Sequence, residues 1–376
     1  MTRVLFAGGG TGGHLYPALT IAAALQAERP QAEVHFVGAK RGVESRVLPA
    51  QGVPHTLLPL EPLRRERPWQ NWRLVPAMLR TIRGLRALFR RFRPGLVVGT
   101  GGYASGPACA YGLLRGVPVA LQEQNSYPGL TTRWLSRYAR QVHLGFPEAR
   151  AYLRPGRRTE VFVTGNPIRE PDPTLDRAEC RARFGLAADS TVVLVVGGSQ
   201  GARALNEALA AALERVASGT LPARPEGLEI LWATGPAHLE AVRRRIEPLG
   251  VDGWVHAVGY IDDMPAALAT ADLAISRAGA IATAEFLAWG IPAVLVPLPT
   301  AAADHQTHNA RALEASGAAV CVPQAELTPE RLWDELRGLA ASPERRATMA
   351  ARARERARPD AAREIARRLI ALVEAG

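Results

Sequence analysis

The chain has 376 residues, of which 47% are hydrophobic and 22% charged, so we expect a globular protein with room for two domains. Its net charge of +11 comes almost entirely from arginine, since Lys40 is the single lysine. Such an excess favours a phosphate-rich partner or an anionic membrane, unless it only reflects genome composition. No stretch approaches the roughly 20 apolar residues of a membrane-spanning helix, and no signal peptide precedes the first strand. The three cysteines form no C-x-x-C pair and are expected to be buried thiols in a reducing compartment: Cys109, Cys180 and Cys321.

The first predicted strand leads into the run Gly8–Gly13, in which only Thr11 is not glycine, and then into a helix expected over residues 15–28. A strand, a glycine loop and a helix in this order point backbone N–H groups at a phosphate. The run also satisfies G-x-G-x-x-G, but the second strand does not end in the acidic residue that would hold a ribose, which argues against an NAD site. The alternative is a tight turn without a ligand, although Thr11 and His14 add polar groups that such a turn does not need.

Strands alternate with helices along the whole chain, which predicts parallel sheets with ligands at the carboxyl ends of the strands. The predicted strands are residues 4–7, 33–38, 96–99, 117–122, 142–144, 161–163, 191–196, 228–233, 255–258, 273–276, 292–297 and 319–322. The composition breaks at residues 164–173, and the strand, glycine loop and helix pattern then recurs at 191–216. We therefore expect an α/β protein with two tandem doubly wound, Rossmann-like domains that face a cleft. Their expected bounds are 1–165 and 166–342, with 343–376 a helical segment that packs back on the first domain.

The segment Leu63–Pro94 differs from the rest, because it carries ten arginines against one acidic residue, Glu66. Trp69, Trp72 and aliphatic residues are interleaved with the arginines. A basic amphipathic segment with tryptophans suits the interface of an anionic bilayer. A core-facing helix with a solvated arginine face fits the composition equally well. Nucleic-acid binding is a third interpretation of this segment, but the segment shows no binding motif for nucleic acid.

Polar residues cluster at the predicted strand ends of the second half. Glu285 lies in a helix that begins near Ala280, where it could accept hydrogen bonds from two ribose hydroxyls while backbone N–H groups hold a diphosphate. A surface carboxylate on a helix is the equally ordinary alternative. The spacing of Asp304, His305 and His308 does not match a metal-ligand set, so these residues do not predict a metal site. The chain also has no D-x-D pair.

Six motifs together resemble the MurG family of peptidoglycan N-acetylglucosaminyltransferases, which make lipid II from lipid I. In the family's order they are Gly9–His14, Gly101–Pro107, Glu123–Asn125, Gly165–Arg169, Gly197–Gly201 and Ser276–Ala280. The resemblance implies a GT-B fold, UDP-N-acetylglucosamine as donor, lipid I as acceptor, and no metal or other cofactor. Because the chain shows no motif for nucleic acid, no nucleic acid partner is expected. It also implies peripheral attachment at the cytoplasmic face of the plasma membrane. One departure is Gln122, which stands where the family usually has a histidine.

The implied reaction is an inverting displacement, in which the 4-hydroxyl of the acceptor's N-acetylmuramyl sugar attacks the anomeric carbon and UDP leaves. His14 is the leading general base, because it closes the glycine loop at a helix N-terminus that disfavours imidazolium, and Glu123 is the other candidate. Tyr103 and Ser105 are candidates for the acceptor side. The implied substrate contacts are Thr11, Gly12, Gly13, Asn125, Arg169, Ser199, Gln200, Gly201, Ile261, Ala280, Ile281, Ala282, Thr283, Ala284, Glu285 and Gln306. The alternatives are a UDP-GlcNAc 2-epimerase on the same fold and a non-catalytic nucleotide-sugar-binding protein of the membrane surface.

Overall fold

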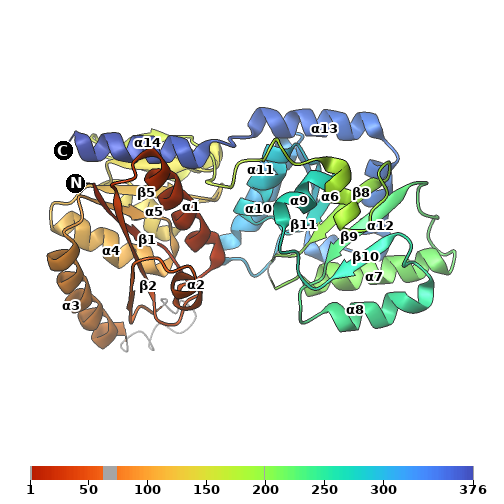
Figure 1. Ribbon diagram of the computed structural model, residues 1–376, viewed down its shortest axis with the longest axis horizontal. Coiled ribbons are helices and arrows are strands. Elements are labelled where there is room, and N and C mark those ends of the chain that lie inside the picture. Colours follow the sequence, from red (N-terminus) through yellow and green to blue (C-terminus); the bar gives the residue numbers. More distant parts are fainter. Residues whose placement is uncertain (1, 62–73, 199, 376) are drawn as a thin grey trace. The chain divides into compact units, whose positions relative to one another are not determined.

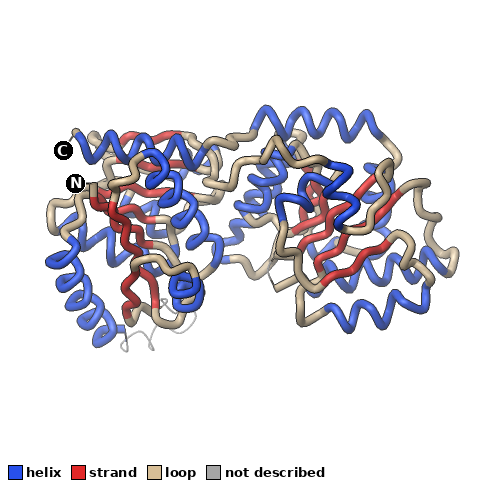
Figure 2. Tube along the Cα trace, in the orientation of Figure 1, coloured by secondary structure: helices blue, strands red, loops and turns tan. Residues whose placement is uncertain are grey.

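The computed structural model describes residues 2–61, 74–198 and 200–375. It divides into two compact units, of which the first comprises Met1–Arg169 with Arg358–Gly376 and the second comprises Glu170–Ala357. Each unit is a parallel sheet covered by helices on both faces (Figures 1 and 2). Ser199 and residues 62–73, with Trp69 and Trp72, lie outside the described part of the chain.

The first unit has a seven-stranded sheet in the order β3-β2-β1-β4-β5-β6-β7, with every pair parallel. Its strands are β1 (Arg3–Ala7), β2 (Glu33–Ala39), β3 (His55–Leu58), β4 (Leu96–Gly99), β5 (Val119–Glu123), β6 (Gln141–Leu144) and β7 (Glu160–Phe162). Its helices are α1 (Gly12–Glu28), α2 (Glu44–Ala50), α3 (Leu74–Phe92), α4 (Gly102–Leu114), α5 (Leu130–Leu135), the 3₁₀ turn η2 (Pro147–Tyr152) and α14 (Ala361–Glu374).

The second unit has a six-stranded parallel sheet in the order β10-β9-β8-β11-β12-β13. Its strands are β8 (Thr191–Val196), β9 (Leu228–Ala233), β10 (Val255–Val258), β11 (Leu273–Ser276), β12 (Ala293–Leu295) and β13 (Ala319–Cys321). Its helices are α6 (Arg177–Arg183), α7 (Arg203–Ala217), α8 (Leu239–Ile246), α9 (Met264–Thr270), α10 (Ala280–Trp289), α11 (His305–Ala315), α12 (Pro329–Ala340) and α13 (Pro343–Arg356), with 3₁₀ turns η3 (Glu247–Leu249), η4 (Ala302–Asp304) and η5 (Gln324–Glu326).

Both sheets have the doubly wound strand order, in which successive strands are first added on one side of the first strand and later strands are added on its other side. The order reverses between β1 and β4 in the first unit and between β8 and β11 in the second. Ligands of such sheets bind outside the carboxyl ends of the strands at this reversal. The glycine-rich loops that follow β1, β4 and β8 all lie there. The prediction of two Rossmann-like α/β domains is confirmed.

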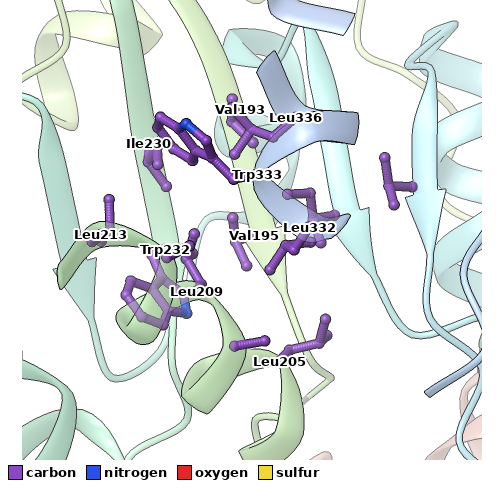
Figure 3. Packing of buried hydrophobic residues seen from close by; sticks show 14 of the residues in the cluster. Val193, Val195, Leu205, Leu209, Leu213, Ile230, Trp232, Leu332, Trp333 and Leu336 are labelled. Carbon is purple, nitrogen blue, oxygen red and sulfur yellow. The ribbon is translucent and has the colours of Figure 1, made fainter. Parts of the chain in front are cut away.

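The core of the second unit shows why these sequences fold as strands and helices. Apolar residues at every second position of β8 and β9 point to one face, including Val193, Val195 and Ile230, and helices α7 and α12 cover that face (Figure 3). Two tryptophans are fully buried there without losing hydrogen bonds. Trp232 Nε1 donates to Asn206 Oδ1 over 3.0 Å, and Trp333 Nε1 donates to the Pro222 carbonyl over 2.8 Å.

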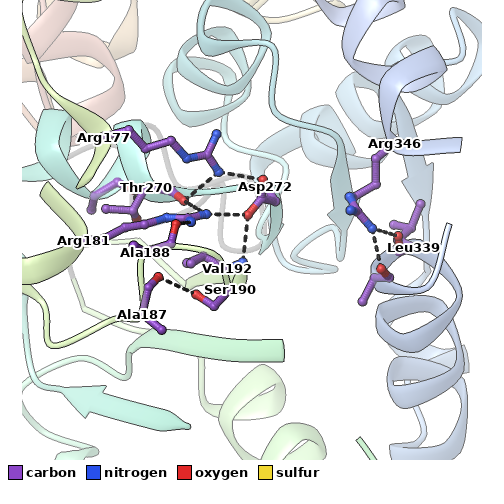
Figure 4. A network of polar contacts seen from close by, with 12 residues as sticks. Arg177, Arg181, Ala187, Ala188, Ser190, Val192, Thr270, Asp272, Leu339 and Arg346 are labelled. Carbon is purple, nitrogen blue, oxygen red and sulfur yellow. Dashed lines mark hydrogen bonds and ion pairs between the residues drawn. The ribbon is translucent and has the colours of Figure 1, made fainter. Parts of the chain in front are cut away.

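A polar network fixes α6 at the amino edge of the second sheet (Figure 4). Asp272, which precedes β11, accepts from Arg177 over 2.6 Å, from Arg181 over 2.9 Å and from the backbone N–H of Val192 over 2.8 Å. Burial lowers the pKa of the Arg181 guanidinium, and the nearby Asp272 charge opposes that shift. The network lies at the edge opposite the carboxyl ends, so its role is to hold the scaffold.

Several elements differ from their predictions in ways that matter for the site. Helix α1 begins at Gly12 rather than at residue 15, so His14 lies in its first turn. Strand β3 was not predicted. The expected division after residue 165 compares with a division after Arg169, and the segment 343–376 contains two helices. Of these, α13 belongs to the second unit and contacts α10, whereas α14 belongs to the first unit and contacts α1. The three cysteines are free and buried, as predicted.

Candidate active site

His14 is held by the loops that follow β4 and β5. Its Nδ1 lies 3.1 Å from Gln124 Oε1, and its backbone carbonyl accepts from the Thr100 hydroxyl over 2.7 Å. The ring lies against Gly101 and Gly102, where a Cβ would come within 2.7 Å of Nδ1 and 3.1 Å of Cδ2. Both glycines also have positive φ, of 94° and 75°. Glycine is therefore favoured at both positions, because the backbone conformation and the nearby His14 ring both disfavour a Cβ.

Three buried amide side chains extend from His14 into the first unit. Gln124 Nε2 donates to the Thr100 carbonyl over 2.7 Å and also to Gln122 Oε1. Gln122 Nε2 donates to Asn166 Oδ1 over 3.2 Å, and Asn166 Nδ2 donates to the Gln124 carbonyl over 2.9 Å. The position at which the sequence departs from the family therefore lies in a continuous hydrogen-bonded chain that ends at His14.

Glu123, the other candidate base, organises its own loop. Its carboxylate accepts from the backbone N–H of Asn125 over 3.1 Å and from that of Gly129 over 3.0 Å. The Asn125 side chain donates to the same carboxylate over 3.3 Å. Glu123 is only 3% exposed, so both of its oxygens are turned toward the loop that carries Asn125.

The glycine loop after β1 is built around Glu44, a residue that the sequence reasoning missed. This fully buried carboxylate accepts from the backbone N–H groups of Gly10 and Ala39. A Cβ at Gly9 or Gly42 would lie within 2.2 Å of its oxygens. The spacing of glycines around Glu44 in residues 38–44 was the available signal, but it became meaningful only once β1 and β2 were seen side by side.

The two acceptor-side candidates lie in the first turn of α4. Tyr103 lies over Gly10, since a Cβ on that glycine would come 2.6 Å from the tyrosine ring. Burial raises the pKa of the Tyr103 phenol, and the charge of Glu44 adds to the shift. Ser105 is 1% exposed and donates to the Gly102 carbonyl over 3.1 Å, so its hydroxyl is used inside the turn.

In the second unit, the loop after β8 packs against the loop after β9. Gly201 has a φ of 75°, and a Cβ there would come 2.0 Å from the Thr234 carbonyl oxygen. Gly235 faces the Gln200 carbonyl in the same way, at 2.4 Å. Asn206 donates to the Thr234 carbonyl over 2.7 Å and so ties the start of α7 to this pair of loops. Gln200 is exposed and Gly201 half-buried, at the carboxyl end of β8.

The start of α10 follows β11 at the same edge of the sheet. The segment begins with Ala280, Ile281 and Ala282, and continues through Thr283 and Ala284 to Glu285. Thr283 is buried with its hydroxyl on the Ala280 carbonyl, whereas Glu285 is half-buried one turn into the helix.

Other predicted residues of this edge serve its loops. Gln306 Oε1 accepts from the backbone N–H of Leu298 over 3.0 Å, and Ile261 is 4% exposed just after β10. Arg277 of the Ser276–Ala280 motif is buried and donates to the carbonyls of Val296 and Pro297 over 3.1 and 3.2 Å. These two hydrogen bonds hold the end of β12 beside β11. Burial lowers the pKa of the Arg277 guanidinium.

The structure therefore gathers the predicted residues into one set in each unit. In the first unit the loops after β1, β4 and β5 bring together Thr11, Gly12, Gly13, His14, Tyr103 and Asn125. In the second unit the segments that follow β8, β10, β11 and β12, including the starts of α10 and α11, carry Gln200, Gly201, Ile261, Ala280, Glu285 and Gln306. Arg169 is exposed and is the last residue of the first unit.

Comparison with known proteins agrees with this architecture. Residues 4–144 match the glycosyltransferase family 28 N-terminal domain, and residues 192–365 match the C-terminal domain of that family. A Moorella thermoacetica protein named UDP-N-acetylglucosamine–N-acetylmuramyl-(pentapeptide) pyrophosphoryl-undecaprenol N-acetylglucosamine transferase is 43% identical over the full length of both chains. A Salinibacter ruber protein of the same name is 41% identical over 99% of this chain and 97% of its own. The crystal structure of Acinetobacter baumannii MurG has a TM-score of 0.75 at 30% identity and covers 99% of this chain and 100% of its own.

The chain belongs to the MurG family of glycosyltransferases. The family and the enzyme class predicted from the six motifs are thereby confirmed, and so is the GT-B fold. An epimerase or a non-catalytic binding protein is not favoured, because full-length relatives carry the transferase name. The roles of the individual site residues stay predictions.

Proposed function

We propose that this chain transfers N-acetylglucosamine from UDP-N-acetylglucosamine to the 4-hydroxyl of the N-acetylmuramyl sugar of lipid I, with inversion, and so produces lipid II. The observation that carries the proposal is the 43% identity, over the whole of both chains, to a transferase named for this reaction. The geometry is compatible with it, because each unit presents a glycine-rich loop at the reversal of its strand order, where nucleotides and phosphates bind in such sheets.

We propose that the second unit binds the donor. The loop after β8 and the start of α10 would hold the diphosphate with backbone N–H groups as charge develops on it. The Gly201 N–H donates to the Gly198 carbonyl over 2.9 Å, so other N–H groups would have to supply these contacts. Glu285, one turn into α10, would accept from the ribose hydroxyls. No step of this scheme requires a metal.

His14 is the better-placed general base of the two candidates. Both oxygens of Glu123 accept from backbone N–H groups of its own loop, and the side chain is buried, so this carboxylate serves to hold the loop. His14 is half-buried at the start of α1, directly after the glycine loop, with one ring nitrogen directed at Gln124. It would take the proton of the attacking hydroxyl as the glycosidic bond forms.

We further propose that α3 attaches the enzyme to the cytoplasmic face of the plasma membrane. The second half of the helix packs into the first unit through buried Leu85, Leu88 and Phe89, as the hypothesis of a core-facing helix predicts.

The first half of α3 instead exposes four apolar side chains at spacings of three and four residues: Val75, Met78, Leu79 and Ile82 are 43–61% exposed. Exposed arginines flank this apolar row: Arg80, Arg83, Arg86 and Arg90. Such a row beside cations suits the interface of an anionic bilayer. No helix in the described part of the chain has the length and hydropathy to span a bilayer.

The decisive experiment supplies the protein with UDP-N-acetylglucosamine and a lipid I analogue and follows both products. The proposal expects UDP and a lipid-linked disaccharide in equal amounts, and neither without the acceptor. An epimerase would convert the nucleotide sugar to its 2-epimer without any acceptor, and a binding protein would form no product. Either of those results would refute the transferase proposal.

A further inference from the structure

We propose that Asn166, Gln122 and Gln124 are positioning residues that set which ring nitrogen of His14 carries a hydrogen. In this arrangement Nδ1 is protonated and Nε2 holds the lone pair of the neutral ring. The inference rests on the proposed role of His14 as base, and it adds to that role the nitrogen that accepts the proton and the groups that select it.

The orientation of the first amide follows from a backbone carbonyl. The Gln124 carbonyl oxygen can only accept, so the Asn166 atom 2.9 Å away is the Nδ2 donor. The Asn166 oxygen then points at Gln122, and it too can only accept. Gln122 therefore presents Nε2 to it over 3.2 Å and turns its own oxygen toward Gln124. Gly145 leaves room for this amide, because a Cβ there would come 2.3 Å from Asn166 Oδ1.

Two hydrogen bonds set the orientation of the Gln124 side-chain amide. Its Nε2 donates to the oxygen of Gln122 and to the Thr100 carbonyl, the latter over 2.7 Å. These two acceptors use both hydrogens of the amide nitrogen. The atom that faces His14 is thus Gln124 Oε1, 3.1 Å from Nδ1. An amide oxygen cannot donate, so Nδ1 must carry the hydrogen of this bond.

The opposite arrangement would be costly in this environment. Turning the Gln124 amide over would place its oxygen against the Thr100 carbonyl and the Gln122 oxygen, which are both acceptors. The three amides are 1–3% exposed, so water could not replace the lost hydrogen bonds. The chain of amides is therefore one cooperative unit, anchored at Thr100 and Gln124 by backbone carbonyls that cannot change their role.

The consequence is that neutral amide groups, and not a charged side chain, select Nε2 of His14 as the nitrogen that accepts the proton. The proton of the attacking hydroxyl passes to Nε2, while the Nδ1–H bond to Gln124 persists in both the neutral ring and the imidazolium. None of the three amides titrates near neutral pH, so the selection holds wherever His14 is neutral. A carboxylate at position 124 would also accept from Nδ1–H, but it would place an oxygen against the Thr100 carbonyl and the Gln122 oxygen. It would also favour the imidazolium, so that less of His14 would be in the neutral form that can accept a proton.

The test is nitrogen NMR of the ¹⁵N-histidine-labelled full-length protein, with the His14 signals assigned from the His14→Ala variant. The two ring nitrogens of a neutral histidine have well-separated shifts according to which one is protonated. We expect a protonated Nδ1 and an unprotonated Nε2 in the unaltered protein, and loss of this preference in Gln124→Met. The opposite tautomer in the unaltered protein, or an unchanged spectrum in Gln124→Met, would overturn the inference. This readout does not depend on activity, so it remains decisive even if His14 proves not to be the base.

Kinetics connects the tautomer to the reaction. Gln124→Met should lower kcat by about tenfold or more, with the roughly 10²–10⁴-fold that a positioned base contributes as the upper limit, and leave the KM for the donor almost unchanged. The matched control is Gln26→Met on the exposed face of α1, which should change neither the spectrum nor kcat. A normal kcat in Gln124→Met with an altered tautomer would separate the two proposals, since it would count against His14 as base.

Discussion

Both carboxylate oxygens of Glu44 accept from the backbone N–H of Gly10, over 3.2 and 3.0 Å. The same carboxylate accepts from Ala39 over 2.8 Å, so one buried acid ties the loop after β1 to the end of β2. The Gly10 N–H is thereby used within the protein, and phosphate binding by this loop would have to rely on its other N–H groups. Glycines at positions 9, 38 and 42 make room for the carboxylate.

The first prediction concerns this tie. Glu44→Gln keeps the shape of the side chain but turns an amide NH₂ toward the Gly10 N–H in either orientation of the amide, so two buried donors face each other. We expect a loss of about 1–3 kcal/mol in the free energy of unfolding, measured by urea denaturation. Glu33→Gln is the matched control, because its half-exposed ion pair with Arg3 should contribute less than about 1 kcal/mol. Equal losses in the two variants would show that Glu44 has no special role.

The second prediction concerns the donor. Glu285→Ala should weaken UDP binding by about 1.5–3 kcal/mol, the range for a hydrogen bond to a charged group. Calorimetry with UDP measures this directly, and Glu240→Ala on the exposed side of α8 controls for the loss of a negative charge. Unchanged affinity in a folded Glu285→Ala protein would remove Glu285 from the proposed site.

The third prediction concerns the base. His14→Ala should lower kcat by roughly 10²–10⁴-fold, while the affinity for UDP stays nearly intact, because the diphosphate is proposed to bind the second unit. Steady-state kinetics with a lipid I analogue, paired with UDP calorimetry, gives both quantities. A raised KM for the acceptor with a normal kcat would instead make His14 a binding residue.

The fourth prediction concerns the membrane. Replacing Val75, Leu79 and Ile82 by serine should release the protein from anionic vesicles, and Arg80, Arg83 and Arg86 to glutamine should weaken binding by about 1 kcal/mol per arginine. Co-sedimentation at low and high salt measures both effects, and only the arginine contribution should fade with salt. The control set is Arg183, Arg244 and Arg337 to glutamine, three exposed arginines of the second unit. Equal release by the control set would mean that net charge, and not α3, governs attachment.

The fifth prediction concerns acid. Burial, with a further contribution from the Arg368 charge, lowers the pKa of His143 from 6.5 to about 3. A histidine whose folded pKa is depressed takes up its proton on unfolding, so its contribution is intact above pH 6.5 and is lost as the pH falls toward 3. The free energy of unfolding should therefore fall by about 1.4 kcal/mol per pH unit in this window for His143 alone. Urea denaturation of the protein and of His143→Gln should differ in slope there, whereas Gln26→Met, which removes no ionisable group, should keep the original slope. Parallel slopes for the protein and His143→Gln would contradict the assignment.

The sequence by itself determined the strands, the glycine loops and the family. These features are local, because an apolar run of four to six residues or a run of glycines carries its meaning within a few positions. The six motifs placed His14 and Gly201 next to strand ends, and the doubly wound topology follows from alternating strands and helices. Helix α1 began earlier than expected because the first N–H groups of a helix need no intrahelical partner, so glycines fit its first turn.

Only the tertiary structure decided what surrounds these residues. Glu44 and Gly10 are 34 positions apart, Gln122 and Asn166 are 44 apart, and His14 and Gln124 are 110 apart, so no local pattern joins them. The tautomer of His14 depends on backbone carbonyls at Thr100 and Gln124, and a carbonyl is present at every residue. Likewise, the row from Val75 to Ile82 reads in sequence like the buried row from Leu85 to Phe89, and only packing exposes one and covers the other. The physical reason is that burial and hydrogen-bond partners depend on which distant segments meet, and only the folded chain determines those meetings.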